Sequence, residues 1–261
     1  MTDLINTQSI HEISGLAGAE QNVALLLDFD GTLVEIAPVP DAVKLDRRIP
    51  AALEALRASL GGALALVSGR PISFLDGVLA PHLFDAAGLH GAQIRMGGEL
   101  RSQSQVPAAM REAIRDLVRF ANSQVGIIVE DKRISVAVHW RLAPQLQDET
   151  LALMRTIAAR MAPEVRLQEG KSVAELVPAG ASKGGAIAWL MTQPPYAGRR
   201  PVFIGDDVTD EAGFEAVNAM GGLSIRIGEG QTRATHRLAS PTALRSIILT
   251  AAETGRLTAS S

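Results

Sequence analysis

The 261-residue chain contains no cysteine, which excludes disulfide bonds, thiolate catalysis and metal sites built on sulfur. Aromatic residues make up only 3% of the chain against 47% hydrophobic residues, so the composition is globular with a bias toward small side chains. Neither sign of charge dominates, because 25 basic and 28 acidic residues leave a formal net charge of -3. That balance gives no basic footprint, and we expect no nucleic-acid partner.

Long hydrophobic runs are also missing. No stretch of about 18 apolar residues occurs, so we expect no membrane span. The first 20 residues have neither the basic start nor the apolar core of a signal peptide, and we therefore predict a cytoplasmic location. A chain of this length can bury one large core or two smaller ones.

The stretch from Val23 to Leu33 is the clearest structural signal in the chain. Its first five residues, VALLL, form a continuous apolar run, which is typical of a strand buried on both faces. The run leads directly into Asp28-Phe29-Asp30-Gly31-Thr32, whose polar residues and glycine end the strand and begin a loop. Because an open parallel sheet has its ligand crevice at such strand ends, two carboxylates are predicted at that crevice.

Around this strand the chain alternates between strand and helix patterns, which predicts a parallel sheet. The first part carries a helix over 48–60, a strand over 63–67, a helix with Pro71 at its first position, and a short strand within 84–95. The alternation resumes near residue 178, with helices predicted over 183–191, 210–220 and 241–252 and strands over 201–204 and 223–227. The expected fold class is α/β, with a doubly wound, Rossmann-like parallel sheet as its core.

Residues 98–177 follow a different pattern and are predicted to form an inserted α+β cap domain, so that residues 1–97 and 178–261 form the core. Helical spacing occurs around 110–121 and 146–161, and strand pairs are predicted at 126–130 with 134–140 and at 165–168 with 172–177. In the strand at 134–140, apolar residues alternate with Ser135, Ala137 and His139. That alternation predicts a sheet with one core face and one open face.

Reactive polar residues follow three of the predicted parallel strands. Asp28 and Asp30 follow the first, Ser68 follows the second, and Asp206 and Asp207 follow the strand at 201–204. All of them can face one crevice, and three or more carboxylates share a small site only when a cation holds them together. Because oxygen ligands without histidine or cysteine favour Mg²⁺, the sequence predicts a magnesium site.

An aspartate, a divalent ion, a lysine and a hydroxyl donor together suit phosphoryl transfer through an aspartyl-phosphate. One aspartate would attack as the nucleophile and another would handle a proton, while Ser68 and Lys183 would bind phosphoryl oxygens. Each residue alone also has a simpler interpretation, the aspartates and Ser68 as turn or cap residues and Lys183 as a solvated lysine at a helix start. Their joint occurrence, in the order that the fold requires, favours the chemical interpretation.

The same segments resemble the four motifs of the haloacid-dehalogenase-like phosphatases. The DxDGT motif corresponds to Asp28–Thr32, the motif serine to Ser68, the motif lysine to Lys183, and the acidic motif to GDDVTDE at 205–211. All four occur in order and span nearly the whole chain.

Three further segments resemble the trehalose-6-phosphate phosphatase family in particular. They are AGLHG at 87–91, VEDKRISVAVHWR at 129–141 and EGKSVAELVP at 169–178. Two positions depart from the pattern of that family: Val177 replaces a common arginine, and Ser182 precedes the motif lysine where aspartate or asparagine is usual.

The resemblance implies a role for each matching acidic residue. Asp28 would attack phosphorus, and Asp30 would protonate the leaving sugar oxygen and then activate water. Mg²⁺ would be held by Asp28, by the backbone carbonyl of Asp30 and by Asp206, with direct or indirect support from Asp207 or Asp210.

The resemblance likewise implies two groups of substrate-binding residues, one for the phosphate and one for the sugar. The phosphate group comprises Lys183, Ser68 and backbone N–H groups of the Asp30–Thr32 loop, which includes Gly31 and Thr32. Gly69 and Arg70, which follow Ser68, are also implied as substrate-binding residues. The sugar group, on the cap, comprises Glu130, Lys132, His139 and Glu175.

The leading hypothesis is a Mg²⁺-dependent phosphatase that converts trehalose 6-phosphate to trehalose and phosphate. This is the last step of trehalose biosynthesis, and it implies functional coupling to a trehalose-6-phosphate synthase. The alternatives are a phosphatase of the same fold acting on sucrose 6-phosphate or a mannosyl phosphate, a phosphomutase, and a non-catalytic sugar-phosphate binding module.

Overall fold

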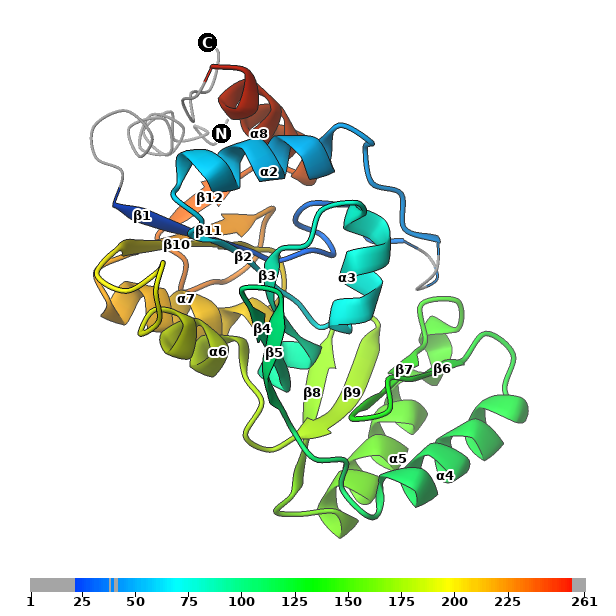
Figure 1. The fold of residues 1–261 in the computed structure, drawn as a ribbon. Helices are drawn as coiled ribbons and strands as arrows, with labels where there is room; N and C mark the ends of the chain where they lie inside the picture. Colours follow the sequence, from blue (N-terminus) through cyan, green and yellow to red (C-terminus); the bar gives the residue numbers. More distant parts are fainter. Residues whose placement is uncertain (1–21, 38, 40–41, 255–261) are drawn as a thin grey trace.

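The structure, a computed structural model, describes residues 22–37, 39 and 42–254 (Figure 1). The first 20 residues, on which the signal-peptide prediction rests, lie outside the described residues. Within the described ranges, no helix has both the length and the apolar character needed to cross a bilayer.

The larger of two sheets has eight strands, and β1 (Val23–Leu27) lies in its interior. Its order is β12-β11-β10-β1-β2-β3-β4-β5, and the strands from β12 to β3 are parallel. β4 and β5 continue the sheet in antiparallel pairing. The other strands are β2 (Leu64–Val67), β3 (Asp85–Gly88), β4 (Gln93–Met96), β5 (Glu99–Gln103), β10 (Arg200–Gly205), β11 (Leu223–Ile227) and β12 (His236–Leu238).

Helices cover both faces of this sheet, which confirms the predicted doubly wound α/β fold (Figure 1). Val23, Leu25 and Leu27 of β1 pack in one core with α2 (Ile49–Ser59), α3 (Ile72–Leu79) and α8 (Pro241–Thr254). Ala24 and Leu26 pack in the other core with α6 (Lys183–Leu190) and α7 (Glu211–Ala219). All five residues of β1 are buried because both faces of the strand are covered.

The smaller sheet is antiparallel with the order β6-β7-β9-β8. Its strands are β6 (Ile128–Asp131), β7 (Val136–His139), β8 (Val165–Gly170) and β9 (Val173–Pro178). Two helices, α4 (Met110–Asn122) and α5 (Gln147–Arg160), pack on one face in a separate apolar core. Three 3₁₀ turns complete the described elements that matter here: η2 (Leu89–Gly91), η3 (Pro144–Leu146) and η4 (Val208–Asp210).

Four details differ from the sequence-based expectations. The face of the smaller sheet predicted to be open is covered at Ser135 and Ala137, which are fully buried because this face looks onto the larger sheet. Strand β5 pairs with β4 in the larger sheet, although its residues lie beyond the boundary predicted at 97. Pro71 is the N-cap of α3 and not its first helical residue. The short strand β12 was not predicted.

Candidate active site

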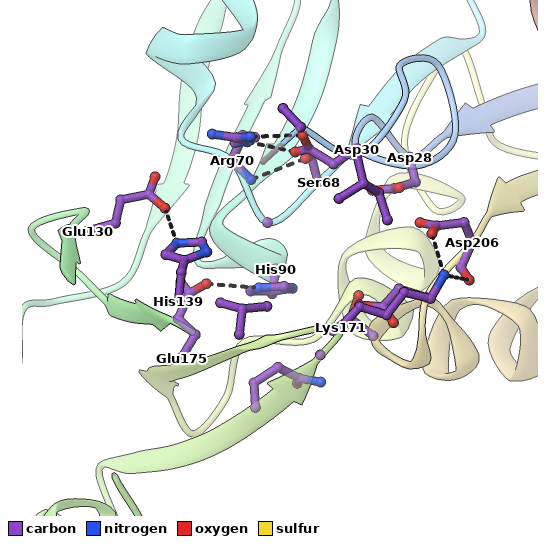
Figure 2. A pocket seen from close by; sticks show the side chains of 18 of the residues that line it. Asp28, Asp30, Ser68, Arg70, His90, Glu130, His139, Lys171, Glu175 and Asp206 are labelled. Atoms are coloured by element: carbon purple, nitrogen blue, oxygen red, sulfur yellow. Dashed lines mark hydrogen bonds and ion pairs between the residues drawn. The ribbon is translucent and has the colours of Figure 1, made fainter. Parts of the chain in front are cut away.

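One pocket lies between the carboxyl ends of the central parallel strands and the polar face of the smaller sheet (Figure 2). It brings together twelve of the predicted site residues from both sheets. They are Asp28, Asp30, Ser68, Gly69, Arg70, Glu130, Lys132, His139, Glu175, Lys183, Asp206 and Asp207. The pocket therefore contains both the predicted phosphate-binding residues and the predicted sugar-binding residues.

Asp28 is held in one orientation at the end of β1. Its Oδ2 atom accepts a hydrogen bond from Thr32 Oγ1 (3.0 Å), and its Oδ1 atom accepts one from Lys183 Nζ (2.7 Å). Lys183 is the first residue of α6, and both Asp28 and Lys183 are 3% exposed. The carboxylate is thus fixed and shielded from water, as a nucleophile requires.

Three buried carboxylates form an acidic cluster at this end of the sheet. Each of Asp28, Asp206 and Asp210 offers an oxygen atom within 4.8 Å of the others. Gly31 makes the close approach possible, because its φ is +79° and a Cβ there would lie 2.3 Å from the Asp206 carboxylate. Asp210 is positioned by its neighbours, since its Oδ2 accepts the backbone N–H groups of Asp206 (3.0 Å) and Asp207 (2.9 Å).

The electrostatics of this cluster favour a bound cation. Burial and the neighbouring Asp210 raise the pKa of Asp28 well above its ordinary value. Burial likewise raises the pKa of Asp206 to about 6, despite the nearby ammonium of Lys171. Burial alone would lower the pKa of Lys183, but Asp210 and Asp28 outweigh it and raise that pKa. Buried, mutually repelling carboxylates with oxygen ligands only fit a hard divalent cation such as Mg²⁺.

Two of the predicted acidic residues have carboxylates outside this cluster. Asp30 pairs with Arg70 through two bonds, from Nε (2.6 Å) and Nη2 (2.8 Å), and the Arg70 guanidinium stacks 4.4 Å from the Phe74 ring centroid. The Asp207 Oδ1 atom accepts the Val208 N–H (2.8 Å) as the N-cap of η4. The structure therefore separates the Asp30 and Asp207 side chains from the three grouped carboxylates.

The polar face of the smaller sheet forms the opposite wall of the pocket. Glu175 accepts hydrogen bonds from Lys132 Nζ (2.7 Å) and Ser135 Oγ (2.6 Å). Burial opposes ionisation of Glu175, but the charge of Lys132 and the hydrogen bonds from Lys132 and His90 outweigh it and hold its pKa far below the ordinary value. Glu130 Oε2 lies 3.0 Å from His139 Nε2 on the same wall.

Two predicted phosphate-binding positions do not line the pocket. The N–H groups of Gly31 and Thr32 donate within the turn, to the carbonyls of Val34 (2.8 Å) and Phe29 (3.3 Å). The Thr32 side chain instead orients Asp28, as described above. The tight turn after β1 uses these donors internally, and their role in binding phosphate stays a prediction.

Sequence reasoning missed several charged or polar residues of the pocket, and Lys171 and His90 are two of them. Lys171 Nζ donates to Asp206 Oδ2 (2.9 Å) and comes from the turn between β8 and β9 (Figure 2). Both residues belong to segments quoted for the family resemblance, EGKSVAELVP and AGLHG, and that was the available signal. Lys171 lies in a turn of the antiparallel sheet, and His90 follows β3, whose short sequence DAAG has no apolar run like that of β1.

Comparison with solved structures gives the fold. The chain superimposes on the Candida albicans trehalose-6-phosphate phosphatase C-terminal domain with a TM-score of 0.83, and this likeness is one of fold. That match has 20% identity and covers 97% of this chain and 98% of the other.

Sequence comparison gives the family. The trehalose-phosphatase family model matches residues 26–245. A Sinorhizobium fredii protein named "probable trehalose-phosphate phosphatase" is 45% identical over 238 residues, covering 90% of each chain. Trehalose-6-phosphate phosphatase of Escherichia coli is 42% identical over 217 residues, covering 83% of this chain and 81% of the other. The chain belongs to the trehalose-phosphatase family.

Proposed function

We propose that this protein hydrolyses trehalose 6-phosphate to trehalose and phosphate through an aspartyl-phosphate on Asp28. The observation that carries the proposal is the fixed, buried Asp28 carboxylate beside Lys183, in a pocket whose other wall carries the charged groups of the smaller sheet. Relatives at 42% and 45% identity bear the names of phosphatases for this substrate.

In the proposed reaction, a carboxylate oxygen of Asp28 attacks phosphorus and the bond from phosphorus to the sugar oxygen breaks. Asp30 donates a proton to that oxygen, and in the second step it accepts a proton from the water that attacks the aspartyl-phosphate. Lys183 and the Ser68 hydroxyl bind the phosphoryl oxygens, where positioned donors stabilise the developing charge. The pair between Asp30 and Arg70 keeps the Asp30 carboxylate at the mouth of the pocket.

We also infer that the acidic cluster holds Mg²⁺, with Asp28, Asp206 and Asp210 as the carboxylates available to it. When bound, the ion offsets the charge between the nucleophile and the phosphoryl group. The backbone carbonyl of Asp30 and the side chain of Asp207 stay as proposed supporting ligands.

Residues 98–177 are proposed to act as a cap that selects the sugar. The support is the row of polar groups on the smaller sheet, where Glu130, Ala137 and Glu175 are paired across neighbouring strands. Glu130, Lys132, His139 and Glu175 are the proposed ligands of sugar hydroxyls. The proposed reaction places the protein at the last step of trehalose biosynthesis, downstream of a synthase, and the cytoplasmic location stays a prediction.

The test is phosphate release from trehalose 6-phosphate, glucose 6-phosphate and sucrose 6-phosphate, with Mg²⁺ and with EDTA. We expect fast release from trehalose 6-phosphate only, and only with Mg²⁺, because the cap groups and the ion are both required. Equal release from all three esters would contradict the sugar-binding role of the cap. Full activity in EDTA would contradict the metal, and no release in any condition would contradict the phosphatase.

A further inference from the structure

The turn at the end of β3 has an unusual backbone that the proposed reaction does not explain. Leu89, His90 and Gly91 all have positive φ angles, of 50°, 57° and 96°. Leucine and histidine rarely adopt this left-handed conformation, and such residues persist only where surrounding contacts hold them. Contacts around the AGLHG segment must therefore hold its backbone in this conformation, beyond what is needed to reverse the chain.

The turn is joined to the loop that carries the predicted phosphate ligands. The backbone N–H of His90 donates to the Ser68 carbonyl (2.9 Å), and that of Leu89 donates to the Arg70 carbonyl (3.0 Å). The imidazole of His90 lies against Gly69, where a Cβ would be 2.8 Å from Nε2. Gly69 thus leaves room for the imidazole ring, and the ring packs against the loop at Gly69.

The same imidazole reaches the smaller sheet. His90 Nε2 lies 3.4 Å from Glu175 Oε2, and the two residues are 6% and 5% exposed. A second bridge runs beside it, because Lys132 Nζ donates both to Glu175 Oε2 (2.7 Å) and to the Gly69 carbonyl (3.0 Å). Figure 2 shows His90 in this position, next to Glu175.

The protonation states of His90 and Glu175 decide which of the two residues donates the hydrogen bond between them. Burial lowers the pKa of His90, so the imidazole is neutral, whereas Glu175 is ionised. A carboxylate only accepts, so Nε2 carries the proton and donates it to Glu175. Glu175 then accepts from the donors Lys132, Ser135 and His90, of which His90 lies in the turn η2 after β3 of the larger sheet.

We infer that His90 is a positioning residue for the phosphatase reaction. Its imidazole fixes the distance between the Ser68–Gly69 loop and Glu175 across the pocket. The inference rests on the proposed function. A sugar phosphate must span from the loop to the smaller sheet, so the relative position of these two parts sets where phosphorus lies against Asp28. An error of about 1 Å in such a position can cost about a hundredfold in rate.

The test compares two substitutions that share the backbone strain and side-chain length but differ in hydrogen bonding. His90→Gln retains an N–H donor, whereas His90→Met has none. We expect His90→Met to lower kcat about tenfold or more below His90→Gln, with KM changed less than about threefold, because the sugar still binds while phosphorus is misplaced. The control is His82→Met, at a histidine near Glu54 outside the pocket, which is expected to keep wild-type kinetics.

A double-mutant cycle with Glu175→Gln tests whether His90 acts through Glu175. In the Glu175→Gln background, we expect His90→Met to lower kcat by no more than about threefold further, because residues that act through one contact are not additive. Equal kcat in the two His90 variants would overturn the inference, since it would leave only backbone strain. A loss confined to KM would also overturn it, because His90 would then be a sugar ligand.

The outcome is separable from that of the proposed function. If the unaltered chain releases no phosphate from trehalose 6-phosphate, the proposed function fails and the inference fails with it. If the unaltered chain is active and the two His90 variants are alike, only the inference fails.

Discussion

Asp28 shows how single residues set the chemistry of this site. Thr32 fixes one of its oxygens and Lys183 the other, so the carboxylate has one orientation. Its pKa is raised by burial and by Asp210, so the surroundings disfavour its charged form. An amide of the same shape would retain the geometry and remove the proposed nucleophile.

Asp28→Asn is therefore expected to abolish turnover, with a loss of at least about 10³-fold, because an amide cannot form the aspartyl-phosphate. The measurement is phosphate release from trehalose 6-phosphate with Mg²⁺. The control is Asp116→Asn on α4, where the carboxylate pairs with Arg160 away from the pocket and turnover should be unchanged. Wild-type turnover by purified Asp28→Asn protein would show that another residue is the nucleophile.

The sequence was sufficient for those residues that follow apolar parallel strands. Asp28, Ser68 and Asp206 meet at one edge because the parallel order of β1, β2 and β10 requires it. It was insufficient for Lys171 and His90, whose partners lie on the other sheet. Such contacts depend on how one sheet covers the other, which no local pattern encodes.

Among the elements, α6 explains one departure from the usual family pattern. Ser182 is its N-cap, and the Ser182 Oγ atom accepts the Gly185 N–H (2.9 Å). Serine fills the cap position as aspartate or asparagine would, because each offers a side-chain oxygen. The cap fixes the start of the helix and with it the place of Lys183, whose ammonium contacts Asp28 and Asp210.

Ser182→Ala should lower the free energy of unfolding by about 1 kcal/mol, because the first turn of α6 loses its cap. Ser182→Asn should restore most of this loss, since asparagine caps equally well. Urea unfolding monitored by circular dichroism measures both. If the alanine and asparagine variants are equally unstable, the hydroxyl acts elsewhere than at the helix start.

Other elements were predicted well when their buried residues form a clear periodic pattern in the sequence, and poorly when they do not. The helices α2, α4 and α5 have apolar residues at helical spacing, and each was predicted within a few residues. Strand β12 has three residues, of which only Leu238 is buried, so its sequence shows no alternation of apolar and polar residues that would predict a strand. The hairpin of β4 and β5 carries polar side chains along an edge of the sheet, and its second strand was assigned to the insert.

At the scale of the whole molecule, the two sheets meet through charged groups. Lys171 binds Asp206, Lys132 binds the Gly69 carbonyl, and His90 binds Glu175. The alternation in β7 predicted a sheet with one open face, and that face is instead buried at Ser135, which donates to Glu175. Polar side chains were read as facing water, whereas here they face the substrate pocket and one another.

Glu175 gives this contact a pH dependence. Its pKa in the folded chain is far below the unfolded value of about 4.5, because the charge of Lys132 and the hydrogen bonds from Lys132 and His90 outweigh its burial. A carboxyl with a lowered folded pKa contributes stability that is fully present above the unfolded pKa. That contribution is lost as pH falls below about 4.5 toward the folded value. The stability that Glu175 contributes by linking the two sheets should therefore decrease in acid.

Glu175→Gln should be less stable than wild type by about 3 kcal/mol at pH 7, because Lys132 loses its buried charged partner. The difference should shrink at pH 3, which lies below the unfolded pKa of about 4.5, because the unfolded wild-type chain then binds a proton at Glu175 that the folded chain does not bind. Urea unfolding at pH 7, 5 and 3 measures it, and the gap should stay constant between pH 7 and 5 because both lie above the unfolded pKa. Glu169→Gln, at an exposed pair with Arg155, is the matched control and should show little difference at any pH. A gap for Glu175→Gln that is the same at pH 3 as at pH 7 would mean that the amide is harmful through its shape, and that the charge of Glu175 does not join the two sheets.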